Sequence, residues 1–284
     1  MLHLRKKYDK IVRWIATFLV CTGIVMTFFS DSYNTIPVIG LGVMFLLLCI
    51  IGMFFKGNRI QHFRPFILMA SLIYFGFIRG GCPCILSYFQ GFILFMAGKG
   101  AFWLSFVVIV FILFLSVVFG AIWCGWLCWL GALQEFIFLK NELKLLKTKK
   151  TQNIIFYIQT VVFVALVLWI TSKQFLVLCG YDPFVSIFRL RIFNWVGYIT
   201  VPLLIISSLF IYRPFCRIVC PIGWMLYIVR YIPFAAHLSI LECVNCGKCL
   251  TYCKLDAIHN KQVEKTCMMC GECKKSNCKR IAIP

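Results

Sequence analysis

Long apolar segments constrain the fold of this chain more than any other feature. A helix needs about 20 apolar residues to cross the roughly 30 Å hydrocarbon core of a bilayer. The spans that we predict cover residues 11–29, 36–55, 65–97, 101–122, 153–172 and 195–212. The chain is 62% hydrophobic and 13% charged, and this apolar content exceeds the roughly 45–50% of soluble domains. The sequence therefore predicts an all-α polytopic membrane protein with about six transmembrane helices.

The basic residues predict the orientation of these helices. The formal net charge is +20, but the lysines and arginines gather in short loops, where the positive-inside rule explains them without a nucleic-acid partner. Five lie in 1–13, three in 56–64, five in 140–150 and eleven in 213–284, together 24 of the 29. We therefore expect a multi-pass protein of a prokaryotic inner membrane, with both termini in the cytoplasm.

The region after residue 64 has an internal repeat. Each half consists of a helix, an apolar outer segment that contains cysteine, a second helix and a C-x3-C-x2-G motif, which begins at Cys124 in one half and at Cys216 in the other. The first helix of the repeat is interrupted around Gly80-Gly81, so we count 65–97 as one crossing plus an outer segment. The predicted units are an N-terminal helix pair (1–64), the repeated transmembrane unit (65–237) and a C-terminal module (238–284).

Eight of the 17 cysteines lie within 36 residues of the C-terminal module. They form two runs, each with three cysteines at x2 spacing and a fourth further on, and in two-cluster ferredoxins the fourth cysteine of each run binds the other cluster. A zinc ribbon would use paired C-x2-C knuckles instead. We therefore expect a ferredoxin module with two 4Fe-4S clusters. The expected ligands are Cys243, Cys246, Cys249 and Cys278 for one cluster, and Cys267, Cys270, Cys273 and Cys253 for the other.

The two C-x3-C motifs provide four further cysteines. Repeats related by symmetry would bring the two motifs together, and four thiolates are the ligand set of a third 4Fe-4S cluster, in the membrane. The alternative is a helix contact or a reversible dithiol, because C-x3-C places two thiols one turn apart on a helix face. Arg213 and Arg217 would offset the cluster charge. The four cysteines are Cys124, Cys128, Cys216 and Cys220.

These motifs together resemble the NapH-type membrane-bound quinol dehydrogenase ferredoxins and, more distantly, the NosR and CcoG proteins. The resemblance covers about residues 101–284. Pro221 follows the second cysteine of a motif as in that family, whereas Trp129 replaces the proline in the other motif. The resemblance implies quinol or ferredoxin oxidation coupled to an extracytoplasmic reductase. Its implied partners are other redox subunits of a membrane complex, together with membrane lipid and quinone.

A second group of cysteines is expected on the outer side. Cys82, Cys84 and Cys179 lie in the outer segments of the two halves. We expect them to form a redox or metal site, such as a further Fe-S cluster with Asp182 or a partner residue as fourth ligand. The Arg79 side chain would balance its charge. A disulfide and simple packing are the alternatives.

The remaining polar and thiol side chains are expected to be structural. Single cysteines inside apolar helices behave as small hydrophobic residues, which applies to Cys21 and Cys49. His62, Glu135 and His237 are expected in solvated loops near the cytoplasmic face, so no quinone site is assigned.

These features predict an electron-transfer subunit of a membrane oxidoreductase complex without catalytic residues of its own. It would relay electrons between a cytoplasmic or quinol donor and an extracytoplasmic redox partner. The alternative is a metal-handling or redox-sensing membrane iron-sulfur protein of the CcoG kind. Methionine-rich copper motifs would favour that alternative, but the nine Met residues are scattered apart from Met268-Met269.

Overall fold

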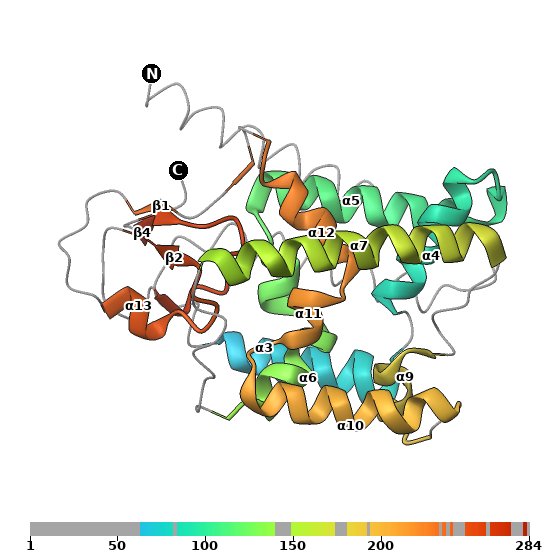
Figure 1. The fold of residues 1–284 in the computed structure, drawn as a ribbon, viewed down its shortest axis with the longest axis horizontal. Helices are drawn as coiled ribbons and strands as arrows, with labels where there is room; N and C mark the ends of the chain where they lie inside the picture. Colours follow the sequence, from blue (N-terminus) through green and yellow to red (C-terminus); the bar gives the residue numbers. More distant parts are fainter. Residues whose placement is uncertain are drawn as a thin grey trace.

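The computed structural model describes residues 63–81, 84–139, 149–173, 181–191, 194–232, 235–236, 239–240, 248–259, 262–273 and 281–282. The described residues are mostly helical (Figure 1). The two predicted spans over residues 11–29 and 36–55 lie outside them.

The predicted broken span consists of three helical pieces. They are α3 (Arg64–Ser71), the π-helix η2 (Leu72–Ile78) and α4 (Ile85–Met96). Gly80 and Gly81 separate η2 from α4 and have φ angles of 60° and 77°. Glycine adopts this left-handed backbone without steric cost, so the helix is interrupted where the sequence predicts.

The first half continues through one long helix into the first C-x3-C motif. A short 3-10 turn, η3 (Gly100–Phe102), leads into α5 (Trp103–Phe119). Gly120, with a φ of 75°, ends α5. The π-helical turn η4 (Trp123–Leu127) and helix α6 (Trp129–Ile137) follow, and they carry the motif.

The second half has the same order of elements. Its helices are α7 (Lys149–Lys173), α9 (Pro183–Phe188), α10 (Trp195–Phe210), α11 (Pro214–Ile218) and α12 (Pro221–Val229). The second motif lies at the α11–α12 junction. It follows α10 as the first motif follows α5.

The helices form two layers in which the two halves exchange partners (Figure 1). One layer contains α4 and α5 of the first half, packed with α7 and α12 of the second half. The other contains α9 and α10 of the second half, packed with α3, η2 and α6 of the first half. In each half, therefore, the first helix and the helix after the C-x3-C motif lie in the same layer as the long helix that precedes the motif of the other half. This exchange brings the two motifs together.

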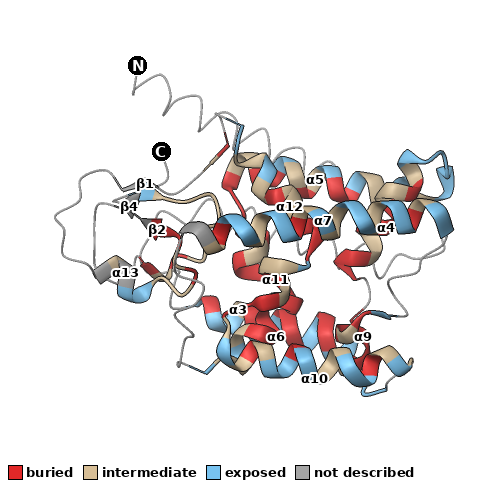
Figure 2. Ribbon diagram, viewed as in Figure 1, coloured by how far each residue is buried: buried red, intermediate tan, exposed pale blue. Residues whose placement is uncertain are grey.

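Two described helices are long and apolar enough to cross a membrane. They extend over Gly100–Phe119 and Thr151–Lys173, and α3–η2, α4 and α10 are shorter apolar helices. Large apolar side chains point outward, among them Tyr157 on α7 and Trp195 on α10, which are 69% and 76% exposed. Figure 2 shows exposed residues along the outer sides of α5, α7 and α10. A large exposed apolar surface marks contact with a membrane or another protein.

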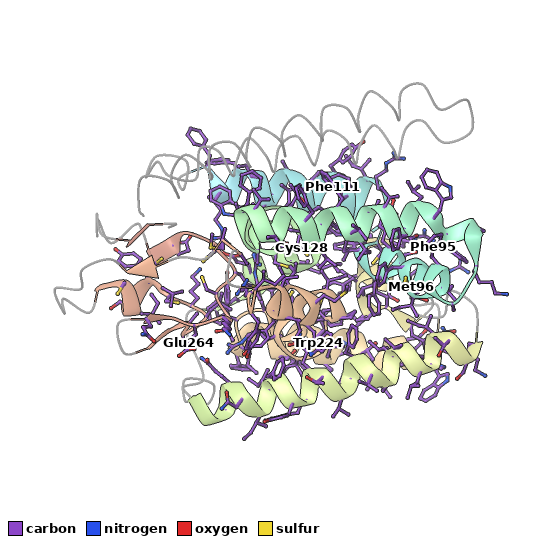
Figure 3. The ribbon with its side chains drawn as sticks, turned by 90° about the horizontal axis from the view of Figure 1, so that it is seen from above. Phe95, Met96, Phe111, Cys128, Trp224 and Glu264 are labelled. Carbon is purple, nitrogen blue, oxygen red and sulfur yellow. The ribbon has the colours of Figure 1, made fainter. Side chains whose placement is uncertain are left out.

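The C-terminal residues form short antiparallel strand pairs at one end of the helices. β1 (Ser239–Ile240) pairs with β4 (Ile281–Ala282), and β2 (Ile258–His259) with β3 (Gln262–Val263); helix α13 covers Lys248–Tyr252. The β1–β4 pair joins the beginning of the predicted module to its end. Seen from above, Glu264 lies at this end, Cys128 within the bundle, and Phe95 and Met96 at the opposite end (Figure 3).

Candidate metal centre

Both C-x3-C motifs have the same backbone conformation. Cys128 precedes α6 with φ −64° and ψ 107°, and Cys220 precedes α12 with φ −64° and ψ 116°. The first cysteine of each motif lies in a helical turn, η4 or α11. Because the backbone is extended at the second cysteine, the two thiols of a motif do not share one continuous helix face. The helix-face geometry considered in the sequence analysis is therefore wrong.

The second cysteine of each motif lies at the N-terminus of the helix that follows. Neither side chain makes a capping hydrogen bond, but backbone N–H groups two and three residues on, including those of Gly131 and Gly223, act on the thiols of Cys128 and Cys220 and favour their thiolate forms. The first N–H groups of a helix lack partners within the helix and carry partial positive charge. The geometry of each C-x2-G segment therefore favours a negatively charged sulfur at the helix start.

Trp129 occupies the helix position that Pro221 occupies in the other motif. Proline is tolerated at the first helical position because its missing N–H would have no partner there. Trp129 is only 2% exposed, and its ring stacks on Phe75 with centroids 5.0 Å apart. Packing thus accommodates the departure from the proline pattern.

The four thiols of the two motifs gather between the helix layers. Every pair among Cys124, Cys128, Cys216 and Cys220 interacts electrostatically. Cys124 and Cys216 line a common cavity of about 60 Å³. Within the described ranges, no three His, Cys, Asp or Glu side chains are close enough to hold one metal ion. A cubane keeps its thiolates further apart than one ion does, because each binds a different iron, and this set of four thiols, three buried and one partly buried, fits that group.

Two buried glutamines hold the second motif. The Gln134 amide donates to the Cys216 Sγ atom at 3.4 Å, and its carbonyl oxygen accepts from the Phe215 backbone N–H at 3.0 Å. The Gln159 amide donates to the Cys220 carbonyl oxygen at 3.0 Å. Hydrogen bonds to cysteine sulfur help to set the reduction potential of an iron-sulfur cluster. The sequence analysis missed both residues; a glutamine inside an apolar helix is the signal for each.

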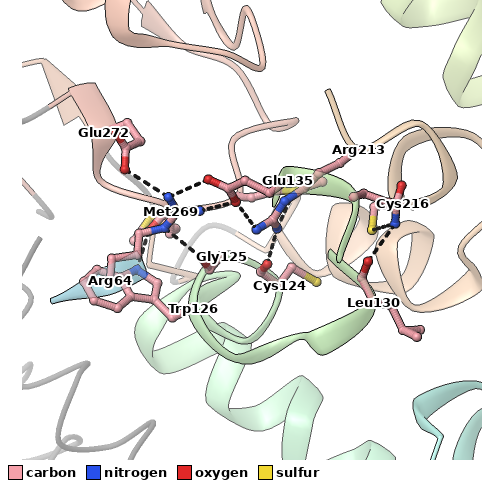
Figure 4. Close-up of polar contacts among 12 residues, drawn as sticks. Arg64, Cys124, Gly125, Trp126, Leu130, Glu135, Arg213, Cys216, Met269 and Glu272 are labelled. Atoms are coloured by element: carbon pink, nitrogen blue, oxygen red, sulfur yellow. Dashed lines mark hydrogen bonds and ion pairs between the residues drawn. The ribbon is translucent and has the colours of Figure 1, made fainter. Parts of the chain in front are cut away.

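A buried ion network lies beside the first motif (Figure 4). Arg64 binds both carboxylate oxygens of Glu135 at 2.8 and 2.7 Å, and Arg213 binds Glu135 at 2.5 Å. Arg64 also binds Glu272 at 2.9 Å and donates to the Gly125 carbonyl oxygen at 3.0 Å. Because the arginine side chains are only 3% and 1% exposed, the network holds their charges inside the protein.

This network corrects the prediction for Glu135. The residue lies in α6 rather than in a solvated loop, and its side chain is 10% exposed. Burial alone would raise the pKa of the Glu135 carboxyl, but Arg213 and Arg64 outweigh it and hold this pKa well below its usual range. Arg64 begins α3 and Arg213 directly precedes α11, and both are buried rather than solvated. An acidic residue within an apolar helix was the signal, because a buried carboxylate needs a charged partner.

The structure describes five of the eight C-terminal cysteines. Cys253, Cys267 and Cys270 interact electrostatically with one another. Cys249 is partly buried and Cys273 is buried. The Cys253 Sγ atom accepts a hydrogen bond from the Ala257 backbone N–H at 3.4 Å. The other three, Cys243, Cys246 and Cys278, lie outside the described residues.

On the side of the predicted outer segments, the structure joins residues from the two halves. Cys84 begins α4 and Asp182 begins α9. The Cys84 thiol donates to the Asp182 carboxylate at 3.4 Å, and the two residues are only 2% and 5% exposed. Arg79 is half-buried at the end of η2. Cys82 and Cys179 lie outside the described residues, as do Cys21, Cys49, His62 and His237.

A larger cavity of about 480 Å³ lies between α7, α9, α10 and α11. Its lining is mostly apolar and includes Phe215, which precedes the second motif, Val219 within that motif, and Asp182. Small-molecule sites commonly have volumes of about 300–1,000 Å³. The cavity is therefore large enough for a small apolar molecule.

The thiol sites and the helical fold define a class of protein: a mostly helical 4Fe-4S protein. The 4Fe-4S binding domain family matches residues 100–150 and 193–237. Each matched segment contains one long helix and its C-x3-C motif. No solved structure matches the chain.

The relatives place the chain more narrowly. The uncharacterized protein MJ0750 of Methanocaldococcus jannaschii is 30% identical over 236 residues, which are 80% of this chain and 95% of that protein. The chain therefore belongs to the same family as this archaeal protein. YccM of Escherichia coli, whose name assigns it to electron transport, is 27% identical over 56% of this chain and 48% of its own length. NirI of Paracoccus denitrificans is 26% identical over 62% of this chain and 28% of its own length.

Proposed function

We propose that this protein is a membrane electron-transfer subunit that moves single electrons between a cytoplasmic or quinol donor and a redox partner on the outer side. The observation that carries the proposal is the meeting of two C-x3-C motifs from two halves of the chain, each with the same backbone conformation and with its second cysteine at the start of a helix. Four thiols held in this way form a ligand set for a redox cluster. The electron-transport name of YccM supports the same role.

Three ligand sets belong to the proposal. The two C-x3-C motifs would hold one 4Fe-4S cluster, and the C-terminal module would hold two. Bound there, the clusters would supply one-electron redox chemistry, while hydrogen bonds, burial and nearby charge would set their potentials. The mutual interaction of Cys253, Cys267 and Cys270 supports the crossed arrangement. In that arrangement Cys253 joins Cys267, Cys270 and Cys273, and Cys278 joins Cys243, Cys246 and Cys249.

The proposed setting is a prokaryotic inner membrane with both termini in the cytoplasm. Two long apolar helices and the exposed apolar faces of α7 and α10 support membrane insertion. Other redox subunits would supply the donor and the acceptor. A quinone is a further proposed partner, and the apolar cavity beside Phe215 and Val219 is its proposed location.

Iron content tests the membrane ligand set. We expect about twelve irons or more in the full chain, from at least three 4Fe-4S clusters, and about four fewer when all four C-x3-C cysteines are replaced by serine. Iron and acid-labile sulfide assays on purified protein give both values. The matched control replaces Cys21 and Cys49 by serine and should keep the iron content of the wild type. Equal iron in the wild type and the four-serine variant would remove the membrane cluster from the proposal.

We also propose an outer-side redox or metal site formed by Cys82, Cys84 and Cys179, with Asp182 as a further ligand. The contact between Cys84 and Asp182 supports it, because this contact joins the outer segments of the two halves. A cluster at this position would extend the electron path across the membrane. A disulfide would end the path at the inner thiol set.

Single serine substitutions at Cys82, Cys84 and Cys179, together with Asp182→Asn, test the outer site. We expect each cysteine variant to contain less iron and to deliver fewer electrons to a membrane-impermeant acceptor, because a lost ligand destabilises the cluster. Vesicles of known orientation with ferricyanide outside allow both measurements on one preparation. If all three cysteine variants keep the iron content and the delivery rate of the wild type, the outer site is excluded.

A further inference from the structure

The two thiol regions of the protein touch through their backbones. A Cβ atom added at Gly125, between the cysteines of the first C-x3-C motif, would overlap the Met268 carbonyl oxygen and lie 3.3 Å from the Cys270 backbone nitrogen. Next to it, the Trp126 indole N–H donates to the Met269 carbonyl oxygen at 3.1 Å. The segment between Cys267 and Cys270 therefore lies directly on turn η4, and only glycine fits at position 125.

The C-terminal side of this contact has an uncommon conformation. Met269 has a φ of 52° and Gly271 a φ of 77°. A left-handed conformation is rare for a side chain such as methionine, so surrounding contacts must hold it. Met269 is 2% exposed and packs close to Gly120 at the end of α5. The segment is thus shaped to fit the helical part of the protein.

Charged side chains clamp both sides of the contact (Figure 4). Arg64 binds Glu272 on the C-terminal side and the Gly125 carbonyl oxygen on the η4 side. Arg213 donates to the Cys124 carbonyl oxygen, and its distance to the Met268 sulfur is 3.8 Å. Glu135 holds both arginines from α6. Removing water from such pairs strengthens them and fixes their geometry.

A further arginine lies between the two sets of thiols. Arg230 interacts electrostatically with both Cys124 and Cys267, and it donates to the Lys265 carbonyl oxygen. A positive charge close to both sets of thiolates stabilises added negative charge, and therefore an added electron, at either set. Cys267 and Cys270 belong to the segment that packs on η4.

From these contacts we infer that the cysteine run beginning at Cys267 is the electron-transfer neighbour of the C-x3-C thiol set, and that Gly125 and Trp126 position the two sites. The inference rests on the proposed function, in which both sets of thiols hold 4Fe-4S clusters. One electron leaves the C-terminal side and arrives on the C-x3-C side, and no bond forms or breaks. Because electron tunnelling weakens steeply with distance, the run beginning at Cys243 then exchanges electrons with the outside donor.

The experiment compares Gly125→Ala with the wild type in the full chain. Both proteins are reduced with dithionite, and EPR measures the spin–spin interaction between the C-terminal and C-x3-C clusters. We expect Gly125→Ala to keep about twelve irons and to lose this interaction, because the added methyl group displaces Met268. Gly100→Ala is the matched control, since nothing lies within 4 Å of a Cβ atom at Gly100, and it should keep the interaction.

The outcomes separate the inference from the proposed function. A wild-type iron content near eight would contradict the third cluster and with it the function. Full iron and an unchanged interaction in Gly125→Ala would overturn the inference and leave the function in place. If the Gly125→Ala protein does not fold with its clusters, the Trp126→Phe variant provides the test of the inference. This substitution removes only the indole N–H that donates to the Met269 carbonyl oxygen. A weakened interaction at full iron then supports the inference, and an unchanged one overturns it.

Discussion

Replacing Glu135 by alanine is expected to destabilise the folded protein by roughly 3–5 kcal/mol, the usual cost of removing one partner from a buried ion pair. Glu135 binds Arg64 through two oxygens and Arg213 through one of them, at 2.5–2.8 Å. Both arginine side chains are at most 3% exposed. Without the carboxylate, two positive charges remain buried side by side. Thermal and denaturant unfolding in detergent measure the loss.

Two other variants control this measurement. Glu135→Gln keeps the shape and the hydrogen-bonding oxygen but removes the charge, so it should lie between the wild type and Glu135→Ala. Lys173→Ala changes the charge by one at an exposed helix end, and surface changes of this kind usually stay within about 0.5 kcal/mol. If Glu135→Ala is no less stable than Lys173→Ala, the network does not support the fold.

The same carboxylate predicts how stability depends on pH. Glu135 has a lowered pKa in the folded protein, so its contribution is fully present above the unfolded pKa of about 4.3. It is lost as the pH falls below that value towards the folded pKa. The stability difference between the wild type and Glu135→Gln should therefore be constant near neutral pH and shrink in acid. Because acid also affects clusters, the comparison is made on cluster-free protein.

Replacing Cys253 by serine is expected to remove about four irons and the EPR signal of one C-terminal cluster. Cys253 lies within electrostatic reach of Cys267 and Cys270, so in the proposed crossed arrangement it would serve the cluster beside turn η4. Serine is a much poorer ligand for iron because its hydroxyl ionises far less readily than a thiol. The spin–spin interaction with the C-x3-C cluster should disappear together with the signal.

Cys249→Ser is the matched variant for this prediction. It should also remove about four irons but keep the interaction with the C-x3-C cluster, because Cys249 serves the other cluster in the crossed arrangement. The spectrum of Cys253→Ser should match that of Cys270→Ser, and the spectrum of Cys249→Ser should match that of Cys246→Ser. If these matches are exchanged, each run binds its own cluster and the crossed arrangement is wrong.

The comparison of prediction and structure is clearest at the C-x3-C motifs. Spacing alone marks Cys124, Cys128, Cys216 and Cys220 as a repeated pair of motifs, because the pattern is local. It leaves open a helix-face dithiol, since helix geometry also places residues four apart on one face. The extended backbone at Cys128 and Cys220 excludes that geometry, and it depends on how each following helix packs.

The buried ion network is a feature that the sequence did not predict. Sequence reasoning places Arg64 and Arg213 among basic loop residues and Glu135 in solvent, because charge is normally exposed. Arg64 lies 71 positions before Glu135, and Arg213 lies 78 positions after it. No local sequence pattern links the three residues. Their pairing follows from the exchange of helices between layers, which puts α3, α6 and the start of α11 side by side.

The sequence by itself determined the apolar helical class of this protein, the repeat, the break at Gly80-Gly81 and the cysteine residues that are candidates for metal binding. These properties depend on composition, short spacing and the conformational freedom of glycine, which act within a few residues. Only the tertiary structure decided that the four C-x3-C thiols meet, that Cys84 contacts Asp182, and that the segment from Cys267 packs on Gly125. Such contacts join residues far apart in the chain, and they form only when burial of the apolar helix faces selects one packing among many.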